Sequence, residues 1–555
     1  MPPRKSAKKP TDKKSSAVRS SGQQTLAPCF VLAIVAFAFY SNIYGNAFLF
    51  DDEMDIVNNG LLRSWRTIGT LLFSSSTAGV GGSDLFYRPL REFLYLVVYS
   101  LFGLSTAAFH LLNVSLHAAN AGLLYTLGRK LNFTRGAAFF AALIWALHPL
   151  QVEAVTYMSG TADPLYVLFC LLGLIVITPD FAPRKYLYVC PLYLLAMLSK
   201  ESGIIFPFLA IATQYLKSED RTDLKIYRRT WPLWITLAFY LLLRRLVIAN
   251  DLAFYTMPNL YTEHLSVRLY TFLATLPAYA KLFVWPFDLH MDRVFPVYPD
   301  PFHIAVFLGF GMVAGSLGLI GAGHVRQRPT LSWGLLWFAV AYALNSGVLM
   351  PMNSIFLEHW MYLPTAGLCL AVGQALAVSI GVGKDSQRLN RITFVALVAV
   401  AILFGARTMD QNAVWHDPVT FYQHAILSGS RSARVHNNLG NAYADEGKLD
   451  AAIEQFRQAV EVSQDSYAQV RHNLALALLA LPDRSDHLDE AIADLNRAIE
   501  IDPNFFQSYG MLANVYAYQG DKPKEILYRR KSEELRAKFN IPSDAYPQPK
   551  LTSGE

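Results

Sequence analysis

Long apolar runs fill most of the first 405 residues of this 555-residue chain. The runs are 15 to 22 residues long, from Ala27 to about Gly405, and each can cross the hydrocarbon core of a bilayer as a helix. Asp, Glu, Lys and Arg make up only 16% of the residues, against 53% hydrophobic residues. After Arg407 the composition turns polar, so we expect an all-α chain with a polytopic membrane domain and a soluble appendage.

Basic residues predict the orientation of the membrane domain. Lys and Arg cluster in turns between apolar runs, and such turns face the cytoplasm. These clusters lie at Arg129–Arg135, Arg184–Lys185, Lys217–Arg229, Arg326–Arg328 and Lys384–Arg391. A crossing by Leu269–Trp285 would invert all later turns, so we interpret that segment as re-entrant or interfacial. About eleven spans remain, which places the loop 46–104 and the C-terminal domain on the outer side. In that loop Leu90–Leu101 is amphipathic, and we expect it to lie along the membrane surface.

Composition also predicts the domain boundaries. Residues 1–26 are a basic Ser/Pro/Lys tail that we expect to be disordered and cytoplasmic. Ala27–Tyr44 carries no small-residue cleavage site, so we interpret it as a retained anchor. We expect the membrane domain at 27–408, a connecting helix at 409–432, a repeat domain at 433–540 and a flexible tail at 541–555.

Small residues recur at a fixed spacing in the polar C-terminal part. The first copy, Ala433–Ser466, carries Leu439, Gly440, Tyr443, Gly447, Ala452, Phe456 and Ala459. A second copy ends near Pro503, and a third begins at Phe506. A period of about 34 residues with this pattern is typical of tetratricopeptide repeats, which stack as helix pairs into an α-solenoid.

Five asparagines are expected on the concave face of the repeats: Asn437, Asn438, Asn441, Asn473 and Asn514. Their amide groups suit the binding of an extended acceptor peptide. They are equally consistent with ordinary contacts between successive repeats. The sequence leaves both interpretations open.

The acidic turn Phe50–Asp55 follows the first apolar run almost at once. Adjacent carboxylates raise one another's pKa unless a cation or a substrate separates them. Asp51, Asp52 and Glu53 are therefore candidates for a catalytic base, or for a site that binds a divalent cation such as Mg²⁺ or Mn²⁺. A solvated acidic cap on a helix end is the alternative.

Further polar groups gather on the predicted outer side, where ionisable residues near membrane depth point to function. The candidates for binding a polar substrate joined to a phosphate are Tyr87, Arg88, His148, Glu153, Asp163, Lys200, Glu201, Glu358 and His359. Lys200 and Glu201 could instead neutralise each other, and Arg88 could anchor a lipid headgroup. His110 and His117 lack a third ligand at matching spacing, which favours buried residues over metal ligands.

The order of these motifs resembles a known family. The matching motifs are Phe50-Asp51-Asp52, Tyr87-Arg88-Pro89-Leu90, Phe109-His110-Leu111, His148-Pro149 with Glu153-Ala154-Val155, Ala162-Asp163, Leu198-Ser199-Lys200-Glu201-Ser202-Gly203, and Glu358 with Tyr362-Leu363-Pro364. Followed by repeats, they resemble the transmembrane-and-tetratricopeptide-repeat O-mannosyltransferases and their bacterial relatives, which are glycosyltransferases of the GT-C class. The resemblance covers nearly the whole chain after residue 27.

The resemblance implies roles for the candidate residues. Asp51 or Asp52 would deprotonate or orient the acceptor hydroxyl, and Glu53 would support it or help to hold a divalent cation. Lys200 would face the phosphate of the lipid donor, with Arg88 as a second candidate. The family often has arginine at the positions of Thr161 and His359. His359 could replace one of those arginines as a donor to the phosphate.

We therefore expect a membrane glycosyltransferase that moves a sugar, mannose by resemblance, from a polyprenyl phosphate to hydroxyl groups of secreted or surface proteins. The expected partners are that donor, an acceptor protein bound by the repeats and the bilayer, and no nucleic acid. The expected location is the bacterial inner membrane with periplasmic repeats, or the endoplasmic reticulum with luminal repeats. The alternatives are transfer of a whole lipid-linked oligosaccharide and a membrane-anchored repeat scaffold without catalysis.

Overall fold

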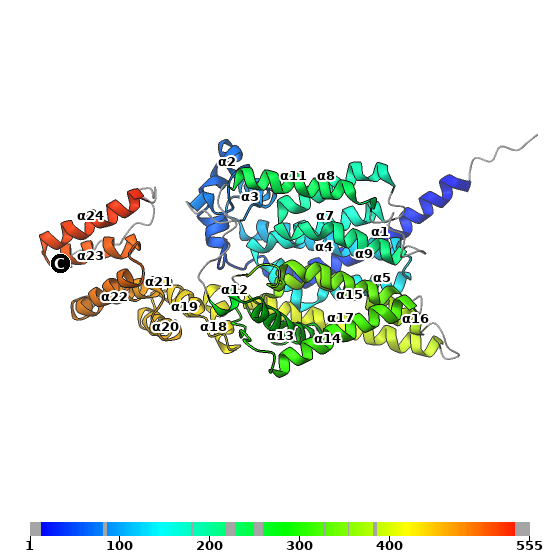
Figure 1. The fold of residues 1–555 in the computed structure, drawn as a ribbon. Coiled ribbons are helices and arrows are strands. Elements are labelled where there is room, and N and C mark those ends of the chain that lie inside the picture. The colour runs from blue at the N-terminus through cyan, green and yellow to red at the C-terminus, as the bar shows by residue number, and fades with distance from the viewer. Residues whose placement is uncertain are drawn as a thin grey trace, which may run out of the picture. The chain divides into compact units, whose positions relative to one another are not determined.

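The computed structural model describes residues 13–80, 86–178, 182–217, 228–248, 259–325, 329–352, 354–380 and 386–538. These residues form helices and turns without a strand, which confirms the all-α prediction for this part of the chain (Figure 1). Contacts divide the chain into two compact units. One unit is Met1–Leu289 with Pro296–Ala413, and the other is His290–Phe295 with Val414–Glu555.

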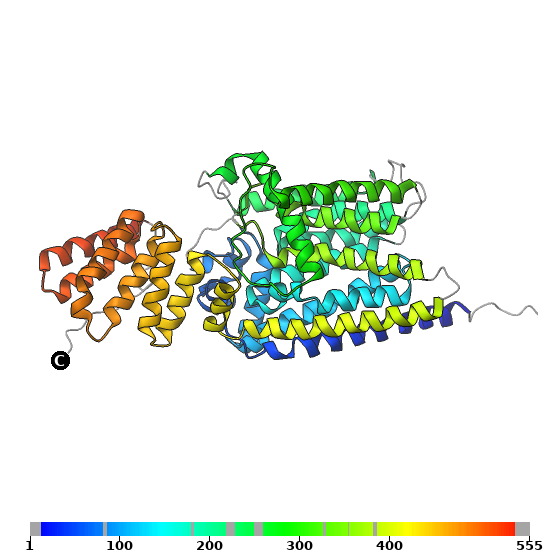
Figure 2. The same cartoon turned by 90° about the horizontal axis from the view of Figure 1, so that it is seen from below.

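The first unit is a bundle of helices that lie side by side (Figure 2). Its helices are α1 (Lys13–Phe39), α2 (Ile68–Leu72), α3 (Pro89–Phe102), α4 (Thr106–Lys130), α5 (Arg135–Leu147), α6 (Val152–Thr156), α7 (Ala162–Ile177), α8 (Tyr186–Ser199), α9 (Phe206–Lys217), α11 (Trp231–Val247), α12 (Leu260–Glu263), α13 (Leu265–Val284), α14 (Ile304–Val325), α15 (Pro329–Tyr342), α16 (Tyr362–Ile380) and α17 (Ser386–Val414).

Helix α4 packs against α1, α5 and α7 and forms part of the bundle core. Both of its histidines are buried, as the sequence predicts: His110 is 1% and His117 0% exposed. The ring of His117 lies 2.8 Å from the hydroxyl of Tyr362 through Nδ1 and 2.9 Å from the carbonyl of Ala146 through Nε2. His117 therefore joins three helices of the core and has no ring nitrogen left for a metal.

Five helical segments of the described part are long and apolar enough to cross a membrane, or six if a bent pair counts as one span. They are Leu26–Ile43, Met158–Ile177, Ile304–Gly323, Glu358–Val378 and Arg391–Val414, and the bent pair is Arg135–Leu147 with Pro149–Thr156. The prediction of about eleven spans is not confirmed, because helices such as α8 and α15, each of 14 residues, are shorter than the roughly 20 residues of a typical span. The segment interpreted as re-entrant is one continuous helix, α13.

The second unit consists of paired helices. They are α18 (Pro418–Leu427), α19 (Ala433–Asp445), α20 (Leu449–Val462), α21 (Ala468–Ala480), α22 (Leu488–Ile501), α23 (Phe506–Tyr518) and α24 (Lys522–Lys538). A Cβ atom on Gly440 would lie 2.5 Å from the ring of Phe456, so glycine is what lets α19 and α20 approach. The short segment His290–Phe295 joins this unit, because Asp292 accepts from the hydroxyl of Ser432 at 2.6 Å and pairs with Arg434.

The predicted connecting helix 409–432 is not one helix. It contains the end of α17 and, after a break, the separate helix α18. Asp417 caps α18 by accepting from the backbone N–H of Thr420 at 2.9 Å, and Pro418 occupies the first helical position. Both residues favour the start of a new helix, which explains the break.

Candidate active site

The acidic turn is bent sharply around Asp52. Phe50 has a φ of 57°, a left-handed conformation that costs a non-glycine residue free energy and often marks a functional position. Asp52 is 0% exposed. Its Oδ2 accepts from the N–H of Leu49 at 3.0 Å, and its Oδ1 accepts from the N–H and hydroxyl of Ser159 at 2.7 and 2.6 Å. Asp52 thus ties the turn to the segment after α6.

Burial raises the pKa of Asp52 to about 7, despite the hydrogen bonds from Ser159 and Leu49 that lower it. Asp51 is half-buried and Glu53 is exposed. The N–H of Asp51 donates to the hydroxyl of Tyr157 at 3.0 Å. Of the two aspartates, Asp51 is the more exposed, and both carboxylate oxygens of Asp52 accept from protein groups.

The segment between α5 and α7 carries Glu153 and lies between His148 and Asp163 in the chain. It consists of the 3₁₀ turn Pro149–Gln151, α6, and the 3₁₀ turn Met158–Thr161, all of them buried. The side-chain amide of Asn113 in α4 donates to the carbonyls of Val155 and Tyr157 at 3.2 and 3.0 Å, which satisfies the irregular backbone. This segment contains Glu153, bonds the acidic turn through Ser159, and leads directly into Asp163 in the first turn of α7.

Two ion pairs hold the predicted phosphate-binding cations. Nζ of Lys200 donates to both oxygens of Asp163 at 2.7 Å. Nε of Arg88 donates to Oε2 of Glu201 at 3.0 Å, and the N–H of Tyr87 donates to Oε1 of Glu201 at 2.9 Å. Although Lys200 and Glu201 are adjacent in the sequence, Lys200 pairs with Asp163 and Glu201 pairs with Arg88. The two residues therefore do not neutralise each other. Among the described residues no hydrogen bond to the terminal Nη atoms of Arg88 is found, and one face of its guanidinium lies over the ring of Phe86, with Cζ 4.4 Å from the ring centroid.

Glu153 and His359 form a further pair. Oε1 of Glu153 lies 2.7 Å from Nδ1 of His359, and Oε2 accepts from the N–H groups of Glu358 and His359 at 2.8 and 3.1 Å. A carboxylate only accepts, so Nδ1 of His359 carries a proton and Nε2 is the ring atom left for a ligand. His148 differs, because its two ring nitrogens bind the carbonyl of Phe283 and the N–H of Leu150.

The acidic turn does not fit a divalent cation well. No group of three or more His, Cys, Asp or Glu side chains is placed to hold a metal ion in the described part of the chain. Both oxygens of Asp52 already accept from N–H or O–H donors of the protein. We therefore derive no step that passes through a metal.

The asparagines of the repeats contact one another. Nδ2 of Asn473 donates to the amide oxygens of Asn437 and Asn441 at 2.9 and 3.1 Å. Nδ2 of Asn438 donates to the hydroxyl of Tyr422 at 3.2 Å, and Asn514 accepts weakly from Arg529 at 3.5 Å. These bonds show that part of the set joins neighbouring repeats.

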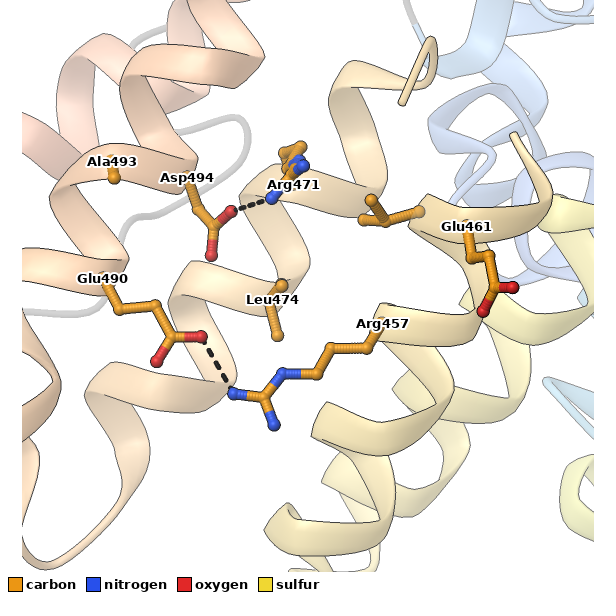
Figure 3. A pocket seen from close by; sticks show the side chains of 8 residues that line it. Arg457, Glu461, Arg471, Leu474, Glu490, Ala493 and Asp494 are labelled. Atoms are coloured by element: carbon orange, nitrogen blue, oxygen red, sulfur yellow. Dashed lines mark hydrogen bonds and ion pairs between the residues drawn. The ribbon is translucent and has the colours of Figure 1, made fainter. Parts of the chain in front are cut away.

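A groove of about 420 Å³ lies elsewhere in the second unit, between α20, α21 and α22. Figure 3 shows the ion pairs Arg457 to Glu490 and Arg471 to Asp494 across it, at 2.9 and 2.5 Å. Its charged groups are matched to each other and it holds none of the predicted catalytic residues, so its size gives no reason to regard it as the active site.

Sequence reasoning missed two parts of the site. Ser159, which donates twice to Asp52, carried no signal because its partner is 107 residues away. Arg91 binds Asp55 at 2.7 Å and Glu92 at 2.5 Å, and all three are buried. Adjacent opposite charges in the predicted interfacial helix Leu90–Leu101 were the signal that could have shown this cluster.

The apolar helices, the buried ion pairs and the repeats define a multi-pass helical membrane protein with a tetratricopeptide-repeat domain. The tetratricopeptide repeat family matches residues 433–466 and 468–505, which confirms the first two predicted repeats.

Over most of its length the chain is similar to proteins named protein O-mannosyl-transferases, which confirms the resemblance predicted from the motifs. It is 25% identical to protein O-mannosyl-transferase TMTC3 of Mus musculus over 476 residues, 78% of this chain and 51% of that protein. It is 25% identical to F38B6.6 of Caenorhabditis elegans, over 81% of this chain and 64% of that protein. TMTC4 of Homo sapiens is 26% identical, over 76% and 64%. The chain thus spans about half to two thirds of the length of these relatives.

Among solved structures, the crystal structure of ArnT from Cupriavidus metallidurans bound to undecaprenyl phosphate matches with a TM-score of 0.38 and 16% identity. The match covers 87% of this chain and 80% of that chain. A TM-score this low carries no argument about the site.

Proposed function

We propose that this chain is a membrane glycosyltransferase of the GT-C class. It would move a single sugar from a polyprenyl phosphate to a hydroxyl group of a secreted or surface protein. The observation that carries the proposal is one buried segment, Glu153–Asp163. It bonds the acidic turn through Tyr157 and Ser159 and binds Lys200 through Asp163, and Lys200 adjoins Glu201, which holds Arg88. A base and a cation on one scaffold are what glycosyl transfer from a phosphate needs. The similarity to named O-mannosyl-transferases supports mannose as the sugar.

In the proposed reaction Asp51 accepts the proton of the acceptor hydroxyl. The hydroxyl oxygen forms a bond to the anomeric carbon, and the bond from that carbon to the phosphate oxygen breaks. The lipid phosphate leaves with the electron pair and gains negative charge, which a nearby cation must stabilise. Asp52 takes no part in the chemistry and holds the bend from which Asp51 projects.

We assign the leaving phosphate to Arg88. Nε of Arg88 is held by Glu201, which orients the planar guanidinium and directs its terminal N–H groups away from that pair. Nζ of Lys200 donates to both carboxylate oxygens of Asp163, so we give Lys200 a structural role beside the site and not contact with the phosphate. His359 would contact the donor through Nε2, since Glu153 holds its other ring nitrogen.

The repeats would bind the acceptor polypeptide, as stacked helix pairs do in many proteins. The proposed location is a membrane that contains polyprenyl phosphates, with the acidic turn and the repeats on the outer or luminal side. The bacterial inner membrane is our first choice and the endoplasmic reticulum the second. Because the chain covers only part of its relatives, their substrates remain proposals for it.

The proposal is tested by intact-protein mass spectrometry of secreted proteins co-expressed with the chain. We expect a hexose-sized mass increment with the wild type, none with Asp51→Asn, and a normal increment with Asp410→Asn, an exposed carboxylate in α17 that serves as the matched control. Equal masses with the wild type and a null strain, together with full complementation of the null phenotype by Asp51→Asn, would reject catalysis and favour the scaffold.

A further inference from the structure

A buried ion cluster lies next to the acidic turn and takes no part in the reaction proposed above. Arg91 of α3 is 2% exposed. Its Nη1 donates to Oδ2 of Asp55 at 2.7 Å, and its Nε and Nη2 donate to Oε1 of Glu92 at 2.9 and 2.5 Å. One guanidinium therefore holds two buried carboxylates together. Without it, two like charges would remain side by side in a poorly solvated place.

Asp55 connects this cluster to the proposed base. The N–H of Asp55 donates to the carbonyl of Asp51 at 2.8 Å, and the single π-helical turn Glu53–Val57 continues from there. Nδ2 of Asn59 donates to the carbonyl of Asp55 at 3.1 Å and reaches Oε2 of Glu92 at 3.4 Å. Short π-helical turns are rare and frequent at functional sites. The side chain of Arg91 thus fixes the backbone that carries Asp51.

The backbone of Arg91 connects the cluster to the proposed phosphate site. Its N–H donates to the carbonyl of Arg88 at 3.0 Å, in the first turn of α3. One turn further, the ring of Tyr95 lies 5.4 Å from the guanidinium of Arg91, and its hydroxyl donates to the carbonyl of Met158 at 2.9 Å. The start of α3 therefore contacts the acidic turn, carries Arg88 and is attached to the buried segment after α6.

We infer that Arg91 is a positioning residue that sets the place of Asp51 relative to Arg88. The inference rests on the proposed function. The base and the phosphate-binding cation must lie on opposite sides of the anomeric carbon, and a misplacement of about 1 Å can cost on the order of 100-fold in rate. A well-packed apolar side chain could replace a buried ion pair in stability. An apolar side chain at position 91 could not donate a hydrogen bond to Asp55. Only a donor at this position links Asp55 to the first turn of α3, which begins after Arg88.

The test is steady-state transfer by the purified full chain, with a polyprenyl-phosphate sugar as the varied substrate. Arg91→Met removes the bond to Asp55, and Asp55→Asn weakens it because the acceptor becomes a neutral amide oxygen. We expect kcat to fall about 10- to 100-fold in Arg91→Met and by less in Asp55→Asn, with the donor KM of both within about twofold of the wild type. Arg91→Lys should recover part of kcat, because an ammonium group can bind one of the two carboxylates. Arg66→Met is the matched control. Arg66 is exposed in the same loop, and no side-chain bond of Arg66 is found among the described residues, so kcat should not change in this variant.

Several results would overturn the inference. One is an unchanged kcat in Arg91→Met, and another is a rise in donor KM with kcat unchanged. A third is a loss of activity that matches the loss of monodisperse protein on size exclusion, which would mean a role in folding only. If Arg91→Met does not fold, Asp55→Asn and Arg91→Lys decide the question. A wild-type chain that transfers no sugar rejects the proposed function and this inference together, whereas an active wild type with normal variants rejects this inference alone.

Discussion

Replacement of Lys200 by methionine should destabilise the first unit strongly, because Asp163 would stay buried without its cation. The two side chains are 9% and 5% exposed and are joined by two bonds of 2.7 Å. Breaking such a pair from one side costs about 3–5 kcal/mol, since the remaining charge is left unpaired. In the double variant Lys200→Met with Asp163→Asn neither of these two positions carries a charge. Most of the lost free energy of unfolding should therefore be recovered.

The assay is thermal unfolding of the purified full chain in detergent micelles, followed by tryptophan fluorescence. Trp145, Trp333 and Trp337 are fully buried in the first unit and report on its core. Lys130→Met, at the exposed end of α4, is the matched control and should unfold at the wild-type temperature. The reasoning is refuted if Lys200→Met is as stable as the wild type, or if the double variant is no more stable than the single one. It is also refuted if the donor KM of the double variant rises tenfold or more, because Lys200 would then be the phosphate ligand.

Three further predictions follow from single contacts. Arg88→Met should raise the KM for the polyprenyl-phosphate donor by about 10- to 100-fold, because a charge-assisted hydrogen bond contributes roughly 1.5–3 kcal/mol. An unchanged donor KM in a kinetic titration would show that Arg88 does not bind the phosphate. Hydrogen bonds from Arg471, together with weaker effects of Arg497, lower the pKa of Asp465 despite its slight burial. Asp465 therefore stabilises the second unit at pH values above its ordinary pKa near 3.8, and this stabilisation is lost as the pH falls. In circular dichroism melts, Asp465→Asn should make the unfolding temperature less dependent on acid pH. The same pH dependence in the variant and the wild type would contradict this prediction. Gly440→Val should destabilise the α19–α20 pair by about 1–3 kcal/mol because of the nearby aromatic ring, and a wild-type denaturant midpoint would show that the contact is not tight.

The repeats could be predicted well because their contacts are local. Gly440 meets Phe456 within one helix pair, and the small residues that permit such contacts recur with a visible period. The same holds for caps such as Asp417, whose partner Thr420 is three residues away. The break before α18 shows the limit, because composition predicts one connecting helix there although the sequence holds a cap at Asp417 and a proline at Pro418.

The sequence motifs nominate the candidate residues but do not distinguish their roles. Asp51 and Asp52 are equivalent in sequence, and only the bonds from Ser159, 107 residues later, show which of them is buried. The family resemblance places Lys200 at the donor phosphate, and it gives no sign that Asp163, 37 residues earlier, binds the Lys200 amine in the structure. Long-range pairing of this kind leaves no periodic signal in a single sequence.

The helix Leu90–Leu101 illustrates the same limit. The structure confirms it as a helix, with bounds Pro89–Phe102. The pattern predicted an amphipathic helix on the membrane surface and gave no partner for its charged start. Arg91 and Glu92 are in fact buried, because Asp55 of the acidic turn folds over them.

The most direct measurement of the central claim is sugar transfer by the purified chain in lipid nanodiscs. The wild type and Asp51→Asn would be incubated with an acceptor protein and, in turn, polyprenyl-phosphate mannose and other polyprenyl-phosphate hexoses, and the acceptor mass would be followed. We predict a hexose increment with at least one of these donors and the wild type, and a loss of at least 100-fold in kcat with Asp51→Asn at unchanged donor KM. Transfer at the wild-type rate by Asp51→Asn would contradict the assignment of the base, and no transfer from any of these donors by the wild type would contradict the proposed function.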